Sequence, residues 1–230
     1  MGLNISIIPA RGGSKEVPRK NIKIFHGKPL IAYSIESAKS SKSVDRVIVS
    51  TDDNEIAVIS KSYGAEVIMR PDSLATDTSP SESALIHVVE TLEKNNSTEI
   101  DLITFLQATS PLRPEGLIDK CFDKMTLEEG DSLVSVCCEM PFYWKEKNGE
   151  GKSIHNYRVR PMRQDIKKEE MIYKENGSLY IVKRDTLIKE KNRLGGKIIL
   201  FPMKPEDAFE IDSEFDFWLL EKIAERRMLK

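Results

Sequence analysis

Long apolar runs are missing from this sequence of 230 residues. No stretch approaches the roughly 18 consecutive apolar residues that a membrane-spanning helix needs. The chain begins Met-Gly-Leu-Asn-Ile-Ser-Ile-Ile, which has neither a basic segment nor a small-residue cleavage site, so we expect no signal peptide. These absences predict a cytoplasmic protein with no membrane partner.

Cysteine and an excess of charge of either sign are also lacking. The formal net charge of −2 provides no general attraction to nucleic acid or to an anionic membrane. The three cysteines, Cys121, Cys137 and Cys138, have no spacing that suits zinc, and we expect free buried thiols in a reducing compartment. A hydrophobic content of 40% is typical of a globular protein, and the length favours a single domain over residues 1–230.

Short apolar runs alternate along the chain with segments of helical spacing, which indicates βαβ units and a mostly parallel central sheet. The expected strands cover residues 5–9, 44–50, 66–69, 101–106, 132–138, 179–182 and 197–201. The expected helices cover residues 29–39, 54–63, 84–94, 117–127, 184–189 and 215–224. The sequence therefore predicts an α/β fold, with ligands at the carboxyl ends of the strands.

The loop that follows the first expected strand is rich in glycine and basic residues. Gly12 and Gly13 allow a tight turn whose N–H groups can face a ligand, and Ser14 adds a hydroxyl. The basic side chains are Arg11, Lys15, Arg19 and Lys20. They suit a polyphosphate, although a solvated basic loop has the same composition. The spacing is neither that of a P-loop nor G-x-G-x-x-G, so we do not expect the phosphate-binding mechanism of either motif here.

Three further strand ends carry polar groups to the same predicted edge of the sheet. These are the turn at Thr51-Asp52-Asp53, the turn at Arg70-Pro71, and the uncharged cluster Gln107-Ala108-Thr109-Ser110, which suits sugar or nucleoside hydroxyls. Residues 77–82 form a strong helix-start signal that includes Ser81, and capping alone is enough to explain it. Each turn, taken singly, could also be an ordinary surface turn.

An acidic segment, residues 208–216, precedes the last expected helix. If it forms a strand, Glu210 and Asp212 share a face, because side chains alternate with a period of two. Paired carboxylates can hold Mg²⁺ together with substrate phosphate oxygens. The alternative is that Asp212 or Ser213 caps the following helix, and both roles can coexist.

Apolar periodicity fades between residues 139 and 171, where aromatic and charged side chains mix and Gly149 and Gly151 indicate a hairpin. A segment of this length without core character is usually functional or an interaction element. We interpret it as an excursion that docks on a second subunit. Its basic string Arg158-x-Arg160-Pro-Met-Arg163 could bind nucleic acid, but the neutral total charge favours capture of an anionic sugar.

Seven segments, in order along the chain, resemble the sugar-activating cytidylyltransferases, the family of CMP-sialic acid synthetase. They are Ile8 to Lys15 with Pro18 to Asn21, Ser50-Thr51-Asp52, Arg70-Pro71, Asp77-Thr78-Ser79, Leu106 to Arg113, Asn176 to Tyr180, and Glu210-Ile211-Asp212. The resemblance implies a Rossmann-like nucleotidyltransferase fold. It also implies transfer of CMP from CTP to an acidic nine-carbon sugar of the nonulosonic (sialic) type, with release of pyrophosphate.

The resemblance also implies a role for each matching residue. Arg11 and Lys20 would be catalytic and would hold the triphosphate with Ser14, with Asn21 nearby. Arg70 and Ser81 would contact the cytidine half, Gln107 the sugar, and Arg163 its carboxylate, which suits a guanidinium fork. Asp212 would bind Mg²⁺ with Glu210, which stands where the family usually has Asp. The family's excursion, here residues 139–171, implies a homodimer in which each loop reaches toward the partner's active site.

Two other functions remain open on the sequence. One is a related cytidylyltransferase or nucleotidyltransferase that acts on 3-deoxy-manno-octulosonate or a sugar 1-phosphate, with the same fold and a different acceptor pocket. The other is a non-catalytic nucleotide-binding or assembly protein whose metal site has decayed, an idea that the Glu at position 210 motivates.

Overall fold

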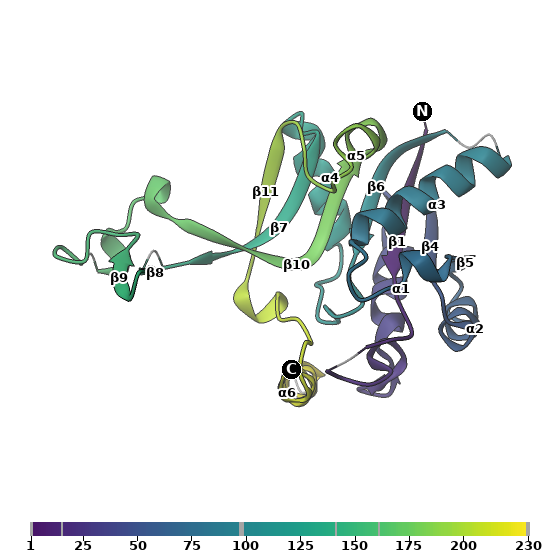
Figure 1. The fold of residues 1–230 in the computed structure, drawn as a ribbon, viewed down its shortest axis with the longest axis horizontal. Helices are drawn as coiled ribbons and strands as arrows, with labels where there is room; N and C mark the ends of the chain where they lie inside the picture. The colour runs from purple at the N-terminus through teal and green to yellow at the C-terminus, as the bar shows by residue number, and fades with distance from the viewer. Residues whose placement is uncertain (1, 15, 97–98, 141, 161, 229–230) are drawn as a thin grey trace.

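The computed structural model describes residues 2–14, 16–96, 99–140, 142–160 and 162–228. Within these ranges a seven-stranded sheet forms the centre of the molecule, with helices on both of its faces (Figure 1). This confirms the predicted α/β architecture. In the described part of the chain, no helix is long and apolar enough to cross a membrane.

All pairings in the central sheet are parallel except the two made by β10, which runs antiparallel to β6 and to β7. The strands in spatial order are β11 (Ile198–Met203), β7 (Ser132–Glu139), β10 (Ile172–Lys183), β6 (Ile100–Leu106), β1 (Leu3–Pro9), β4 (Arg46–Thr51) and β5 (Glu66–Met69). The expectation of a mostly parallel sheet is therefore confirmed.

Helices cover the two faces of the sheet because the central strands are apolar on both sides. Ile8 of β1 packs in the layer with α1 (Leu30–Ser40), α2 (Asn54–Ser62) and α4 (Leu117–Leu127). Its neighbour Ile7 packs in the opposite layer with α3 (Ser81–Asn96) and α5 (Arg184–Glu190). Both isoleucines are fully buried, so β1 is a central strand whose end is fixed from both sides.

The C-terminal helix α6 (Glu214–Met228) belongs to a third apolar cluster. Its Phe217 and Leu220 pack with Phe25 and Leu30, at the short hairpin of β2 (Ile24–Phe25) and β3 (Lys28–Pro29). This hairpin was not predicted, because two-residue strands carry no periodicity. The packing brings the end of the chain to the loop that follows β1.

Three sequence expectations need correction. The strand expected at residues 179–182 is β10, which begins at Ile172, and the last helix extends beyond residue 224 to Met228. The three cysteines are free, as expected, but only Cys121 is buried, whereas Cys137 and Cys138 are partly exposed.

Residues 139–171 leave the sheet as an arm that projects from the extended ends of β7 and β10 (Figure 1). The predicted hairpin is present as β8 (Trp144–Lys147) and β9 (Glu150–Ser153), joined through Asn148 and Gly149, both at positive φ. Large apolar side chains are exposed along the arm at Trp144, Ile154, Tyr157, Val159 and Met162. The role of the arm in dimerisation remains a prediction.

Candidate functional site

The loop after β1 is fixed against the turn that follows β4. The backbone N–H of Gly12 donates to Asp52 Oδ1 at 3.3 Å, and a Cβ on Gly12 would lie 2.7 Å from Asp53 Oδ2. Glycine is therefore needed at position 12 for close approach. Gly13 has no neighbouring atom within 4 Å of an added Cβ, and neither glycine has a positive φ, so the expected tight turn is not what requires the pair.

The basic residues of this loop make different contacts. Arg11 Nη1 lies 2.9 Å from Asp77 Oδ1 and donates to the Thr76 carbonyl at 3.0 Å. Lys20 Nζ donates to the Ile211 carbonyl at 2.6 Å. Arg19 is instead held by two carboxylates of the α2 N-terminus, which raise its pKa further. Lys15 lies outside the described residues.

Asn21 is buried beside the loop, and its Nδ2 donates to the Arg11 carbonyl at 3.0 Å. This bond fixes the backbone that carries Arg11. Arg70, which follows β5, has a side chain only 6% exposed, with Nη2 3.6 Å from Asp52 Oδ1. Its Nε has no hydrogen-bond partner among the described residues, and burial lowers its pKa. An arginine stays charged under these conditions, so Arg70 presents an incompletely paired cation.

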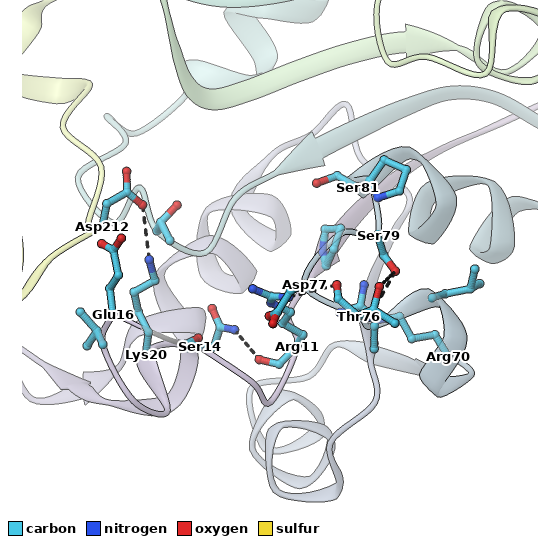
Figure 2. Close-up of a pocket in the computed structure, with 17 residues that line it drawn as sticks. Arg11, Ser14, Glu16, Lys20, Arg70, Thr76, Asp77, Ser79, Ser81 and Asp212 are labelled. Atoms are coloured by element: carbon cyan, nitrogen blue, oxygen red, sulfur yellow. Dashed lines mark hydrogen bonds and ion pairs between the residues drawn. The ribbon is translucent and has the colours of Figure 1, made fainter.

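One cleft of about 640 Å³ collects these side chains. All six residues predicted to bind the nucleotide line it, together with Asp212: Arg11, Ser14, Lys20, Asn21, Arg70 and Ser81. Figure 2 shows Lys20 and Asp212 at one end, Arg11 and Asp77 in the middle, and Arg70 with Ser79 and Ser81 at the other end. The parallel strands and the start of α3 therefore bring these predicted residues together.

The sequence identified Asp77-Thr78-Ser79 as a matching segment and a helix start, but it did not predict that residues 74–80 form a wall of the cleft. Thr76 accepts from Arg11 and pairs with Ser79 at 2.7 Å between their hydroxyl oxygens. Thr109 also lines the cleft, although the sequence assigned it no individual role. The high content of Ser and Thr between residues 73 and 81 was the sequence feature that could have indicated this wall.

Gln107 and Glu210 do not line this cleft and meet at a different place. A Cβ added to Gly177 of β10 would lie 2.6 Å from Gln107 Nε2 and would overlap Glu210 Oε1. Glu210 lines a second cavity of about 310 Å³ with Lys174, and Asp212 lines both cavities. The predicted sugar-binding glutamine is thus brought to the predicted metal ligands.

Arg113 joins three parts of the chain: the loop after β6, β10 and α1. Its guanidinium donates to the Gln107 carbonyl at 2.6 Å, to the Ser178 carbonyl at 3.0 Å and to Ser34 Oγ at 3.0 Å. Burial lowers the pKa of Arg113 to about 9, and the nearby Glu210 opposes this shift. Arg113 therefore remains a cation at neutral pH, and it orients the backbone on which Gln107 lies. The sequence identified it only as part of a longer motif.

Arg163, the other predicted sugar-binding residue, lies in the short 3₁₀ turn Arg163–Asp165 within the arm. Its side chain is outside the part of the chain that the structure describes. The arm that carries this turn projects away from the sheet (Figure 1).

The acidic segment before α6 is not a strand, so the shared strand face that a strand would have given Glu210 and Asp212 is absent, and the capping alternative applies. Residues 208–213 lack sheet pairing, and the Ile211 N–H donates to the Thr109 carbonyl at 2.9 Å while the Ile211 side chain is fully buried. Ser213 caps α6: its Oγ accepts from the Asp216 N–H at 3.2 Å, and Asp216 accepts from the Ser213 N–H at 2.8 Å. Since Ser213 supplies the cap, the Asp212 carboxylate is left 70% exposed.

Glu210 and Asp212 fit a divalent cation. Glu210 Oε1 is buried without a hydrogen-bond partner among the described residues, and burial, with Asp212 nearby, raises the pKa of Glu210 to about 7. Within the described ranges no group of three or more His, Cys, Asp or Glu side chains is arranged to hold a metal. A cation bound by this pair would need further ligands from substrate and water, which is the usual coordination of Mg²⁺.

A mostly parallel sheet with a cation-lined cleft at its carboxyl edge is typical of nucleotide-binding α/β proteins. The family model described as cytidylyltransferase matches residues 5–230. The chain therefore belongs to the cytidylyltransferase family.

Named relatives cover most of the chain. It is 35% identical, over 98% of its length, to an N-acylneuraminate cytidylyltransferase of Oncorhynchus mykiss, and it spans about half (50%) of that protein. It is 35% identical to a CMP-N,N'-diacetyllegionaminic acid synthase of Legionella pneumophila, with 96% of both chains covered. A structure of CMP:2-keto-3-deoxy-manno-octonic acid synthetase complexed with CTP covers 98% of this chain and 99% of its own, at 17% identity and a TM-score of 0.70, and shares its fold.

The division of roles between Ser213 and Asp212 can be tested by stability. Ser213→Ala removes the helix cap and should lower the free energy of unfolding by about 1 kcal/mol. Asp212→Ala removes an exposed carboxylate, 3.4 Å from Lys20 Nζ, and should change it by less than about 1 kcal/mol. Urea denaturation of both variants checks this. Equal losses, or a larger loss for Asp212→Ala, would contradict the assignment of the cap to Ser213.

Proposed function

We propose that this chain is a Mg²⁺-dependent cytidylyltransferase that transfers CMP from CTP to the anomeric hydroxyl of a sialic-type nonulosonic acid and releases pyrophosphate. The observation that carries the proposal is the cleft, in which the cations Arg11, Lys20 and Arg70 lie along one wall and Asp212 lies at one end. Family membership and the names of the relatives support the nucleotide and the acceptor class.

The order of side chains along the cleft suggests how CTP lies in it. Lys20, at the end near Asp212, and Arg11, in the middle of the cleft, bind the triphosphate, and Ser14 contributes its hydroxyl. Arg70 and Ser81, at the opposite end, contact the cytidine half. The anomeric hydroxyl then attacks the α-phosphorus in line, and pyrophosphate departs along the cationic wall. Positioning and electrostatics supply most of the rate.

The acceptor sugar lies on the other side of Asp212, in the second cavity. Asp212 lines both cavities, so its carboxylate can lie near CTP in the first cavity and near the sugar in the second. Gln107 orients the sugar hydroxyls, and the carboxylate of the sugar pairs with Arg163. Mg²⁺, when held by Asp212 and Glu210, neutralises charge on the reacting phosphate. We assign no general base to this chain, and the proton of the anomeric hydroxyl passes to water.

Pyrophosphate release from CTP tests the proposal directly. The chain is incubated with CTP and Mg²⁺ and with sialic, legionaminic or pseudaminic acid, 3-deoxy-manno-octulosonate or a sugar 1-phosphate. We expect release with at least one nonulosonic acid and none without an acceptor. Release only with 3-deoxy-manno-octulosonate or a sugar 1-phosphate would contradict the acceptor class. CTP binding without release by any sugar would indicate a non-catalytic nucleotide-binding protein.

Lys20→Ala should lower kcat by about two to three orders of magnitude, since it removes a preorganised charge from the transferred phosphate. Lys20 also bonds the Ile211 carbonyl, so a loss of about 1 kcal/mol of stability is expected as well. Steady-state kinetics and thermal unfolding measure the two effects. Lys61→Ala, which removes an exposed lysine of α2, is the matched control and should leave both unchanged. Near-normal turnover by Lys20→Ala would contradict its role.

We further propose a homodimer in which the arm of each chain brings Arg163 toward the partner's acceptor cavity. The arm leaves the sheet with exposed apolar side chains, among them Trp144 and Tyr157, whose rings are 5.5 Å apart. Sedimentation velocity at assay concentration should give a dimer. An active monomer at that concentration would exclude the idea. The use of CTP, a cytosolic nucleotide, also implies a cytoplasmic enzyme.

A further inference from the structure

β10 contains a large bulge at its Asn176-Gly177-Ser178-Leu179 segment. Glu175 pairs with Val136 and Tyr180 pairs with Val134, so four residues of β10 lie opposite the single residue Ser135 of β7. Bulges of this kind redirect a strand locally and are common beside functional sites. This one lies at the edge of the sheet that carries Gln107.

Polar contacts hold the bulge in one conformation. Ser135 Oγ accepts from the Leu179 N–H at 2.9 Å and lies 2.7 Å from Asn176 Oδ1. Asn176 Oδ1 also accepts from the Ser178 N–H at 3.1 Å, and Arg113 donates to the Ser178 carbonyl. Ser135, Asn176 and Ser178 are all buried, so these bonds have little competition from water.

Gly177 lies at the turning point of the bulge, with a φ of +62°. The space where a Cβ would stand is filled by the ends of two side chains, Glu210 and Gln107, whose Nε2 lies 2.6 Å from that point. By contrast, Gly116 also has a positive φ, of +68°, and no atom lies within 4 Å of its added Cβ. Gly177 is therefore distinguished by what occupies the position of its missing side chain, and not by its backbone alone.

We propose that Gly177 is a positioning residue for the reaction: the absence of its Cβ creates the space in which the Glu210 carboxylate and the Gln107 amide lie side by side, next to Asp212. The inference rests on the proposed function, which gives Glu210 to the metal and Gln107 to the sugar. It also explains how Glu is accommodated at position 210, because the additional methylene of Glu, relative to Asp, extends the carboxylate over Gly177.

The expected consequence of a side chain at position 177 is local. Glu210 and Gln107 are flexible at their tips, so an added methyl group displaces these tips while the bulge is held by Ser135 and Arg113. The left-handed backbone at position 177 also strains any residue that carries a Cβ. The fold should survive, and the metal and acceptor groups should lose their positions.

Gly177→Ala tests the proposal, with Gly116→Ala as the control for backbone strain. In Gly177→Ala we expect Mn²⁺ affinity of the protein–CTP complex, measured by electron paramagnetic resonance of free Mn²⁺, to fall by about tenfold or more. The KM for the acceptor should rise while the Kd for CTP changes less than about threefold. Gly116→Ala should leave all three values unchanged. A Gly177→Ala protein with wild-type Mn²⁺ affinity and acceptor KM overturns the proposal.

A double-mutant cycle with Glu210→Asp separates the effect of the lost space at Gly177 from the effect of backbone strain. Asp withdraws the carboxylate by one methylene, so adding Gly177→Ala to Glu210→Asp should weaken Mn²⁺ binding by less than about threefold. An equal penalty in both backgrounds overturns the proposal. If Gly177→Ala alone fails to fold, thermal unfolding decides: Gly177→Ala/Glu210→Asp should fold, and a double variant that stays unfolded is contrary to the inference.

The wild-type chain is measured first, so that the proposed function and the role of Gly177 are tested separately. A wild-type chain that binds no Mn²⁺ with CTP and releases no pyrophosphate contradicts the proposed function. A wild-type chain that does both, with a Gly177→Ala variant that matches it, contradicts only the role of Gly177.

Discussion

Parallel pairing of β6, β1, β4 and β5 is the constraint on which the site depends, because it brings the loops after these strands to one edge of the sheet. The spatial order of the strands then determines on which side of the Arg11 loop each of the other loops lies. β1 carries the Arg11 loop in the middle, with Gln107 after β6 on one flank and Arg70 after β5 on the other. Asp52, after β4, contacts both the Gly12 N–H and Arg70, so this turn couples the two cationic loops. The nucleotide and acceptor sides proposed here thus follow from strand order.

The reversed strand β10 completes the edge that the parallel strands begin. Because β10 runs antiparallel to β6, its N-terminal half reaches the same edge as the carboxyl end of β6. The bulge therefore faces Gln107, and Arg113 bonds both the Gln107 and the Ser178 carbonyls. A buried guanidinium is costly unless it is well paired, and here backbone carbonyls and the nearby Glu210 offset its burial. The acceptor side is thus built from strand ends fixed by one cation.

The sequence predicted those features that depend on strand ends and failed on those that depend on long-range pairing. Arg11 and Arg70 were placed correctly because apolar runs locate the ends of β1 and β5. Arg19 has the same local composition as Arg11, but it pairs with Asp53 and Glu55, more than thirty residues away, which no local pattern reveals. The first half of β10 was missed because its bulge disrupts the alternation of apolar and polar residues. The sequence left the acidic segment open between a strand and a helix cap, since its alternation arises from one buried residue, Ile211, between two polar ones.

Lys20, in the loop after β1, contacts the acidic segment before α6 and so connects the N-terminal and C-terminal parts of the site. Its side chain is only 15% exposed, and its bond to the Ile211 carbonyl holds the acidic segment against the cleft although that segment has no sheet pairing. Lys20 and Arg113 both lower the pKa of Glu210, yet burial and Asp212 outweigh them. The local cations therefore do not fully stabilise two ionised carboxylates, and a triphosphate would bring further negative charge to the same place. On the proposed function, a divalent cation held by Asp212 and Glu210 would supply the positive charge that this imbalance calls for.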